Sequence, residues 1–209
     1  MSNETIDLQK ILNETRETLL NPKEYFSSMS LQGGYVEPII KAAIYGVVAG
    51  LFALLWSLLG FSPTGGGGIW GGAIGVMALI WSVVGAIATA FIGGALMAVI
   101  SIICGGNRDL EANVRVASSL MAIYPIRAFL AFTYGISFSL GGIVGLGISL
   151  YCVYLIYHAA IEALKGREPS VKIAAIVLVV FALIGFYGGK EVYKTLEDNS
   201  DMFQEEQVD

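Results

Sequence analysis

The stretch "IWGGAIGVMALIWSVVGAIATAFIGGALMAVISIIC", residues 69–104, contains no Asp, Glu, Lys or Arg. As a single helix it would be about 54 Å long at 1.5 Å per residue. The hydrocarbon core of a bilayer is about 30 Å thick, and about 20 apolar residues cross it. The stretch therefore predicts membrane insertion. It allows two arrangements, either one span preceded by an interfacial lead-in or a hairpin of two short spans.

The rest of the chain is also strongly apolar. Apolar residues make up 56% of the 209 and charged residues 14%, where a soluble domain carries about 25% charged residues. Residues 42–107 and 128–160 contain no charged side chain. We expect an all-α integral membrane protein, a bundle of five transmembrane helices at about 38–59, 76–103, 115–134, 140–163 and 171–189. A hairpin at 69–104 would add a sixth.

Loop charges separate these two counts, because cytoplasmic loops carry an excess of Lys and Arg. With five spans and a cytoplasmic N-terminus, nine basic residues lie inside, and only Lys190 and Lys194 lie outside. With six spans the count becomes six inside against five outside. The charges predict five spans in the inner membrane, with the N-terminus cytoplasmic and the C-terminus outside. The nine inner residues are Lys10, Arg16, Lys23, Lys41, Arg108, Arg115, Lys165, Arg167 and Lys172.

Two polar segments flank the membrane domain, which we place at 38–190. Residues 1–37 form an arm in which Leu8, Ile11, Leu12 and Leu19 fall roughly on one helical face. Such a cytoplasmic amphipathic helix either shields its own membrane domain or rests on the membrane or a partner. Residues 191–209 hold seven acidic residues, which predicts a disordered tail. The net charge of −5 comes largely from this tail, and nothing indicates nucleic-acid binding.

Motifs appear in a recognisable order along this framework. "NPKEYFSSM" (21–29), with Pro22 and Phe26, precedes the first span, and "ANVRVASSLMAIYPIRAFL" (112–130), with Tyr124 and Pro125, opens the third. Together with the arm and the five spans, this order resembles the Yip domain (Ypt-interacting protein) family over about residues 15–190.

The resemblance implies a five-helix membrane domain with a cytoplasmic N-terminus. Eukaryotic members of the family associate with Rab-type GTPases and act in vesicle traffic. This chain lacks their long cytoplasmic N-terminal region and their "DLYGPL"-like motif, which argues against GTPase binding. It looks more like the short prokaryotic members.

Arg127 is a charge inside an otherwise uncharged run and follows Pro125 by two positions. We expect it about 20 Å into the third span. Pro125 cannot donate its backbone bond, which would free the carbonyl of Met121. The guanidinium is expected to snorkel outward or to bond exposed carbonyls and the hydroxyls of nearby tyrosines, which are Tyr124, Tyr134 and Tyr151. Its role is either a structural anchor or part of an ion or lipid path.

His158 and Glu162 lie one helical turn apart near the cytoplasmic end of span four. We interpret the pair either as an anchor at the membrane boundary or as a proton relay or ion gate. No Ser or Cys nucleophile has an obvious base beside it, and two cysteines with one histidine cannot complete a four-ligand zinc site. We therefore expect no enzymatic activity, no cofactor, no metal and no disulfide between Cys104 and Cys152.

Glycines recur at small-xxx-small spacing, which lets transmembrane helices approach closely. They predict packing within the chain or, alternatively, a seam between two copies. The pairs are Gly46 with Gly50, Gly141 with Gly145, and Gly185 with Gly189.

Two function classes fit the sequence. The first is a non-catalytic membrane scaffold or adaptor of the Yip type, which holds membrane or cytoplasmic protein partners through the arm and inner loops. The second is a small channel or transporter for an ion, proton or lipid, with Arg127 in the polar path. The scarcity of polar residues within the spans favours the first.

Overall fold

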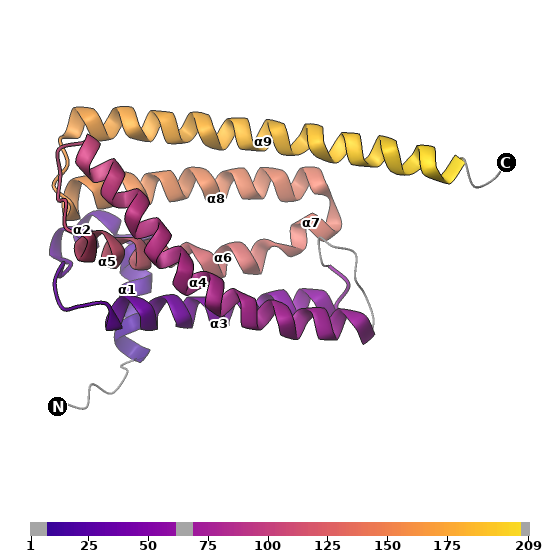
Figure 1. Ribbon diagram of the computed structural model, residues 1–209, viewed down its shortest axis with the longest axis horizontal. Helices are drawn as coiled ribbons and strands as arrows, with labels where there is room; N and C mark the ends of the chain where they lie inside the picture. The colour runs from indigo at the N-terminus through magenta and orange to yellow at the C-terminus, as the bar shows by residue number, and fades with distance from the viewer. Residues whose placement is uncertain (1–7, 62–68, 206–209) are drawn as a thin grey trace.

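The computed structural model describes residues 8–61 and 69–205, and over these ranges it contains helices and no strand. Figure 1 shows them as a bundle of roughly parallel and antiparallel rods, with the two ends of the chain at opposite ends of the bundle. In chain order they are α1 (Leu8–Leu20), α2 (Pro22–Ser28), α3 (Val36–Leu58), α4 (Ile69–Ile103), α5 (Leu110–Leu120), α6 (Ile123–Leu130), α7 (Phe132–Ile136), α8 (Phe138–His158), the π-helical turn η1 (Ala159–Ala163) and α9 (Glu168–Glu205).

Five segments of the described chain are long and apolar enough to cross a bilayer, which confirms the predicted all-α, five-span architecture. They are Val36–Leu58, Leu79–Ile103, Leu110–Ile136, Phe138–Ala163 and Glu168–Gly189. The hairpin alternative is wrong, because α4 is one uninterrupted helix of 35 residues. At about 52 Å it is longer than the hydrocarbon core. Figure 1 shows it crossing the bundle obliquely, which is how a long helix fits a thinner layer.

The two ends of the bundle differ in what they carry. The arm end holds α1, α2 and the loops after α4 and η1, and these loops are joined by hydrogen bonds from Asn107 N to Leu164 O and from Arg167 N to Cys104 O. The far end holds α7 and the end of α3 (Figure 1).

The third span is broken into α5, α6 and α7. The Asp109 side chain caps α5 by accepting the Ala112 N–H at 3.1 Å, and α5 ends at Leu120. The Met121 carbonyl then accepts the Tyr124 N–H at 2.8 Å. Pro125 therefore sits in the first turn of α6, where a missing N–H breaks no helical bond. The expectation that Pro125 leaves the Met121 carbonyl free is wrong, because the break places a local donor against it.

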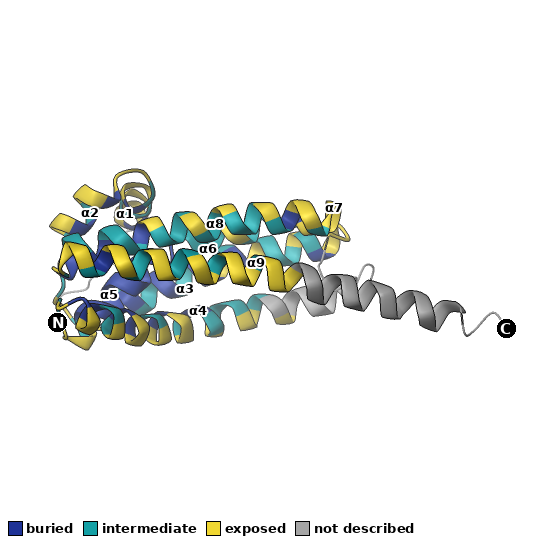
Figure 2. Ribbon diagram, turned by 90° about the horizontal axis from the view of Figure 1, so that it is seen from above, coloured by how far each residue is buried: buried dark blue, intermediate teal, exposed yellow. Residues whose placement is uncertain are grey.

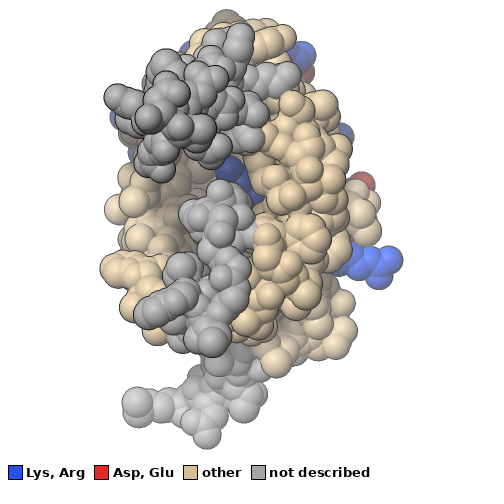
Figure 3. Space-filling view, turned by 90° about the vertical axis from the view of Figure 1, so that its right-hand side faces the viewer, with Lys and Arg blue, Asp and Glu red and all other residues tan. Residues whose placement is uncertain are grey.

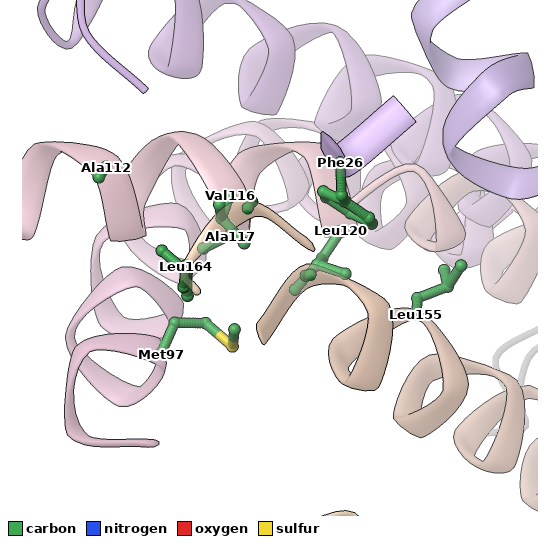
Figure 4. Packing of buried hydrophobic residues seen from close by; sticks show 10 residues of the cluster. Phe26, Met97, Ala112, Val116, Ala117, Leu120, Leu155 and Leu164 are labelled. Atoms are coloured by element: carbon green, nitrogen blue, oxygen red, sulfur yellow. The ribbon is translucent and has the colours of Figure 1, made fainter. Parts of the chain in front are cut away.

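The packed core lies at the arm end. Phe26 of α2 inserts against Val116 and Leu120 of α5, with Leu155 and Leu164 nearby (Figure 4). Among the spans the third has the largest buried share and the last the smallest. Figure 2 shows this contrast as dark blue on α5 and much yellow on α9. The exposed side of α9 is rich in Ile, Val and Phe, as expected for a lipid-facing surface.

Two expectations for the flanking segments need correction. In α1, Ile11 and Thr18 face the bundle, whereas Leu8 and Leu12 are exposed, so the leucines do not all share the shielded face. At the other end of the chain, residues 191–205 were expected to be disordered, but α9 continues as a helix to Glu205. The remaining tail residues, 206–209, lie outside the described ranges.

Candidate functional site

Arg127 lines a cavity of about 260 Å³ at the far end, between α6, α7, α8 and α9. We call it the far-end cavity. Glycines of two facing helices form much of its wall, and Tyr134, Phe138 and Phe186 supply aromatic surface. The glycines are Gly142 and Gly145 on α8 and Gly185 and Gly189 on α9. Figure 3 looks onto this end and shows mostly uncharged described surface, with basic side-chain atoms visible inside a hollow.

Arg127 is exposed, and no hydrogen bond or ion pair joins it to any residue whose side chain the structure describes. The expected contacts do not form. The Met121 carbonyl accepts from Tyr124, and the Tyr151 hydroxyl donates to the backbone carbonyl of Leu19. An unpaired arginine at the centre of a transmembrane helix costs about 2.5–3.5 kcal/mol on insertion scales, and less when it can snorkel. This charge is therefore not stabilised by the described protein groups around it.

The glycine pairs have three different environments. Gly46 and Gly50 lie against α4, where the Ser82 hydroxyl donates to the Gly46 carbonyl at 2.8 Å. Gly141 lies against the ring and backbone of Tyr134 in α7, and Gly145 lies against the Tyr134 hydroxyl. A side chain at Gly185 or Gly189 would meet nothing within 4 Å. The first pair packs against α4, the second accommodates an aromatic ring, and the third leaves space for the cavity.

His158 and Glu162 lie at the arm end and are not brought near Arg127. The π-helical turn η1 begins directly after His158, so the i,i+4 geometry expected for the pair is interrupted. Among the described residues, no ion pair joins them. The His158 ring instead makes edge-on contacts with Tyr154 and Tyr157, with ring centroids at 4.7 and 5.4 Å. Tyr124 and Pro125 belong to the first turn of α6 and pack as part of the span.

A buried charge cluster occupies the arm end, and the sequence did not reveal it. Arg115 is 6% exposed and uses each part of its guanidinium. Its Nε donates to Ser30 O at 3.0 Å, one terminal nitrogen donates to Gly34 O at 3.1 Å, and the other pairs with Glu37. One side chain of α5 therefore fixes both the segment that leads into α3 and the first turn of α3.

Lys41 is the second basic residue of this cluster and is 4% exposed. Its Nζ lies 2.5 Å from Glu14 Oε2 and 3.3 Å from Glu37 Oε1. Glu14 belongs to α1 and Glu37 to α3, so one ammonium ties the arm to the first span. We call Glu14, Glu37, Lys41 and Arg115 the arm cluster. Charges buried to this degree persist because they are paired and hydrogen-bonded.

Further polar contacts extend the hold on the arm. Thr15 of α1 hydrogen-bonds the Tyr45 hydroxyl at 2.7 Å, and Tyr25 of α2 hydrogen-bonds Ser119 at 2.9 Å. The Glu111 carboxylate accepts the backbone N–H groups of Gly33 and Gly34 at 2.7 and 2.6 Å. The arm is thus bound through α1, through α2 and through the segment before α3.

Only weak sequence signals point to the arm cluster. Glu37 and Lys41 stand at i,i+4 spacing at the start of an apolar run, where a solvated pair would look the same. Arg115 precedes "VASSLMA" and was counted as a loop charge. Their partners lie up to 85 residues away along the chain, and pairing at that distance cannot be read from spacing.

The described residues contain no group of three or more His, Cys, Asp or Glu side chains that could hold a metal ion. Cys104 and Cys152 are both free. Cys104 is buried beside the loop that joins α4 to α5, and burial raises the pKa of its thiol. Such a thiol is a poor nucleophile at neutral pH.

Comparison with known proteins gives one match. The family model described as Yip1 domain matches residues 16–189, a range that includes Pro22, Phe26, Tyr124 and Pro125. No curated protein matches the chain, and no solved structure matches it.

Proposed function

The chain belongs to the Yip1 domain family, and from that premise we propose that it is a non-catalytic membrane scaffold whose arm end holds protein partners. The arm cluster is the observation that carries this proposal. Lys41 and Arg115 fix α1 and the segment before α3 onto the membrane domain, so the arm presents a surface of fixed shape. A preorganised surface loses less conformational entropy when a partner binds.

The arm surface has apolar groups available for such a partner. Leu8, Leu12 and Leu20 of α1 are exposed, each by more than half of its area. Ile11 and Thr18 of the same helix pack inward. Apolar side chains on a polar arm outside the bundle are typical of a contact surface.

The proposal places the arm end in the cytoplasm and the molecule in the inner membrane. Its support is the count of nine inner against two outer basic residues. Reporter fusions test the orientation, and we expect residue 107 inside and the C-terminus outside. A fusion at residue 64, which lies outside the described ranges, should also report outside. Reporters that place both termini on one side would contradict the five-span topology.

The transport alternative receives less support from the geometry. A path for an ion, proton or lipid would have to continue from Arg127 toward the arm end. The described residues that line the far-end cavity all belong to α6, α7, α8 and α9, and Ser149 is the one on α8 nearest the arm end. His158 lies nine residues further along, about 14 Å away at helical rise.

Site-specific photo-cross-linking in native membranes tests the scaffold proposal. A photoreactive residue at Leu12 should capture a protein of discrete size, and the adduct should weaken when Leu8 is replaced by Ser. The matched control is the same photoreactive residue at Ile11, which packs inward and should cross-link only within the chain. Replacing the exposed polar pair Gln9 and Asn13 with Ser should leave the adduct unchanged.

The mass and the position of the adduct distinguish the scaffold proposal from its alternatives. A Leu12 adduct containing only lipid would mean that the arm rests on the membrane, which contradicts the scaffold proposal. An adduct at twice the chain mass would make a second copy of the chain the partner. Equal capture from Leu12 and Ile11 would show that the arm is not held as described.

A further inference from the structure

Two hydrogen-bond donors that have no partner among the described side chains line the far-end cavity. Arg127 makes no hydrogen bond or ion pair with any residue whose side chain the structure describes. The Tyr134 hydroxyl has no such hydrogen bond either, although the Tyr134 ring is packed over Gly141 and Gly145. Both residues line the same cavity, and no acidic residue lies among its described lining. Among its described lining residues, the cavity therefore combines a cation and a neutral donor with no anion to receive them.

The open space beside these donors results from glycines on the neighbouring helix α9. Gly185 and Gly189 of α9 face it, and a Cβ added at either would meet nothing within 4 Å. Ser149 of α8 donates its hydroxyl to the Gly145 carbonyl at 2.9 Å, so its own donor is already used. The cavity is thus bounded by residues that neither fill it nor compete for the two free donors.

Arg127 lies in the half of the third span that is nearer the far end. Arg127 precedes the end of the third span at Ile136 by nine residues, which is about 14 Å at helical rise. An arginine side chain can extend several ångströms toward the interface while its stem stays in the apolar region. Phe138 and Phe186 give the cavity an apolar border suited to the first carbons of an acyl chain.

We propose that the far-end cavity binds a phosphate-type oxyanion, supplied by the headgroup of a membrane phospholipid. The Arg127 guanidinium makes paired, charge-assisted hydrogen bonds to two phosphate oxygens, and the Tyr134 hydroxyl donates a third. The glycerol and acyl portions leave the cavity between α8 and α9. Free phosphate offers the same oxyanion without the apolar portion. The site is independent of the scaffold proposal, because the arm lies at the other end of the bundle.

Native mass spectrometry of the detergent-solubilised full chain tests this assignment with three probes. Dioctanoyl phosphatidylglycerol carries the phosphate and short chains, dioctanoylglycerol lacks the phosphate, and inorganic phosphate lacks the chains. We expect the phospholipid to bind at least tenfold more tightly than dioctanoylglycerol. Weak binding of inorganic phosphate would assign the site to a lipid, and equal binding would assign it to a free oxyanion held by the same donors.

Two kinds of variant test the site: one kind removes a hydrogen-bond donor, and the other fills the cavity. Arg127→Gln removes the charge and should weaken phospholipid binding about 10- to 100-fold, as expected for a lost charge-assisted pair in a nonpolar setting. Gly185→Leu fills the cavity without touching Arg127 and should weaken binding to a similar degree. Tyr134→Phe should weaken it a few-fold.

Matched controls separate the site from general effects of charge and bulk. Gly188→Leu adds the same side chain to the same helix, also into open space, but Gly188 does not line the cavity. Arg108→Gln removes an exposed charge at the arm end. Both should bind as the parent does. Melting curves verify that each variant is folded, and Arg127→Gln decides the outcome if Gly185→Leu does not fold. Parent-like binding by Arg127→Gln, or no preference for the phosphate-bearing lipid, would overturn the proposal.

Discussion

Arg115 and Arg127 lie in the same broken span, twelve residues apart, and their surroundings are opposite. Arg115 is buried at the arm end and bonds Ser30, Gly34 and Glu37. Arg127 is exposed at the far end and has no described partner. A buried arginine whose donors all have partners within the protein has a structural role. An arginine with unused donors beside a cavity is available to a ligand.

The two ends are also held together by different forces. At the arm end, ion pairs and hydrogen bonds join α1, α3 and α5. At the far end, the Trp56 ring packs among Phe61, Phe129 and Phe132, and its N–H donates to the Ala128 carbonyl at 3.0 Å. The aromatic contacts hold α3 against α6 and α7 without any charge. The far end therefore does not need Arg127 for its packing.

The largest effect is expected from Arg115→Leu. This change leaves Glu37 with one fewer cation and leaves the carbonyls of Ser30 and Gly34 without their donor. Removing one partner of a buried ion pair typically costs about 3–5 kcal/mol. We expect a correspondingly lower free energy of unfolding and faster proteolysis within residues 8–35. Denaturant unfolding in detergent and limited proteolysis measure both.

Arg108→Leu is the control for Arg115→Leu, because Arg108 is exposed in the loop before α5. Its free energy of unfolding should stay within about 0.5 kcal/mol of the parent value. If Arg115→Leu behaved in the same way, the arm cluster would not hold the arm, and the contrast between the two ends would fail.

The sequence predicts much of the fold because a transmembrane segment must be long and apolar, and because basic residues are enriched in cytoplasmic loops. Long uncharged runs and the distribution of basic residues were enough for five spans and for a single α4. The order of Pro22, Phe26, Tyr124 and Pro125 was enough for the family. The helix from 191 to 205 was missed, because an acidic composition suggests disorder whether or not a preceding helix continues.

The candidate sites were predicted less well, because they depend on contacts between residues far apart in the sequence and on open space between helices. The arm cluster depends on pairs such as Arg115 with Glu37, which only the folded chain brings together. The sequence singles out Arg127 as an isolated charge, but its cavity depends on which glycines face open space. Gly46 and Gly185 look alike in the sequence, yet the first meets α4 and the second meets nothing within 4 Å.

A smaller effect is expected from glycine substitutions that compare packing density at the two ends. A Cβ at Gly94 would lie 2.8 Å from the Val114 Cα, where α4 crosses α5 near the arm end. Overpacking of this kind costs about 1–3 kcal/mol. Gly185→Ala at the far end meets open space and should be neutral or stabilising by up to about 1 kcal/mol, because alanine favours the helix. In parallel denaturant curves, the midpoint of Gly94→Ala should therefore fall, and that of Gly185→Ala should stay at the parent value or rise. Equal losses would show that the far end is as tightly packed as the arm end.

The smallest effect on stability is expected from Arg127→Leu, the counterpart of Arg115→Leu in the same span. No described protein partner is lost when Arg127 is removed, and the change also removes a charge held at membrane depth. In lipid-depleted detergent, the free energy of unfolding should stay within about 0.5 kcal/mol of the parent or rise slightly. Arg127→Lys keeps the charge and the apolar stem but not the planar fork, so its stability should also match the parent. Adding phosphatidylglycerol should then stabilise the parent more than either variant, because a ligand stabilises only the folded state that binds it. A loss for Arg127→Leu as large as that for Arg115→Leu would mean that Arg127 is paired within the protein. The two arginines would then have the same role.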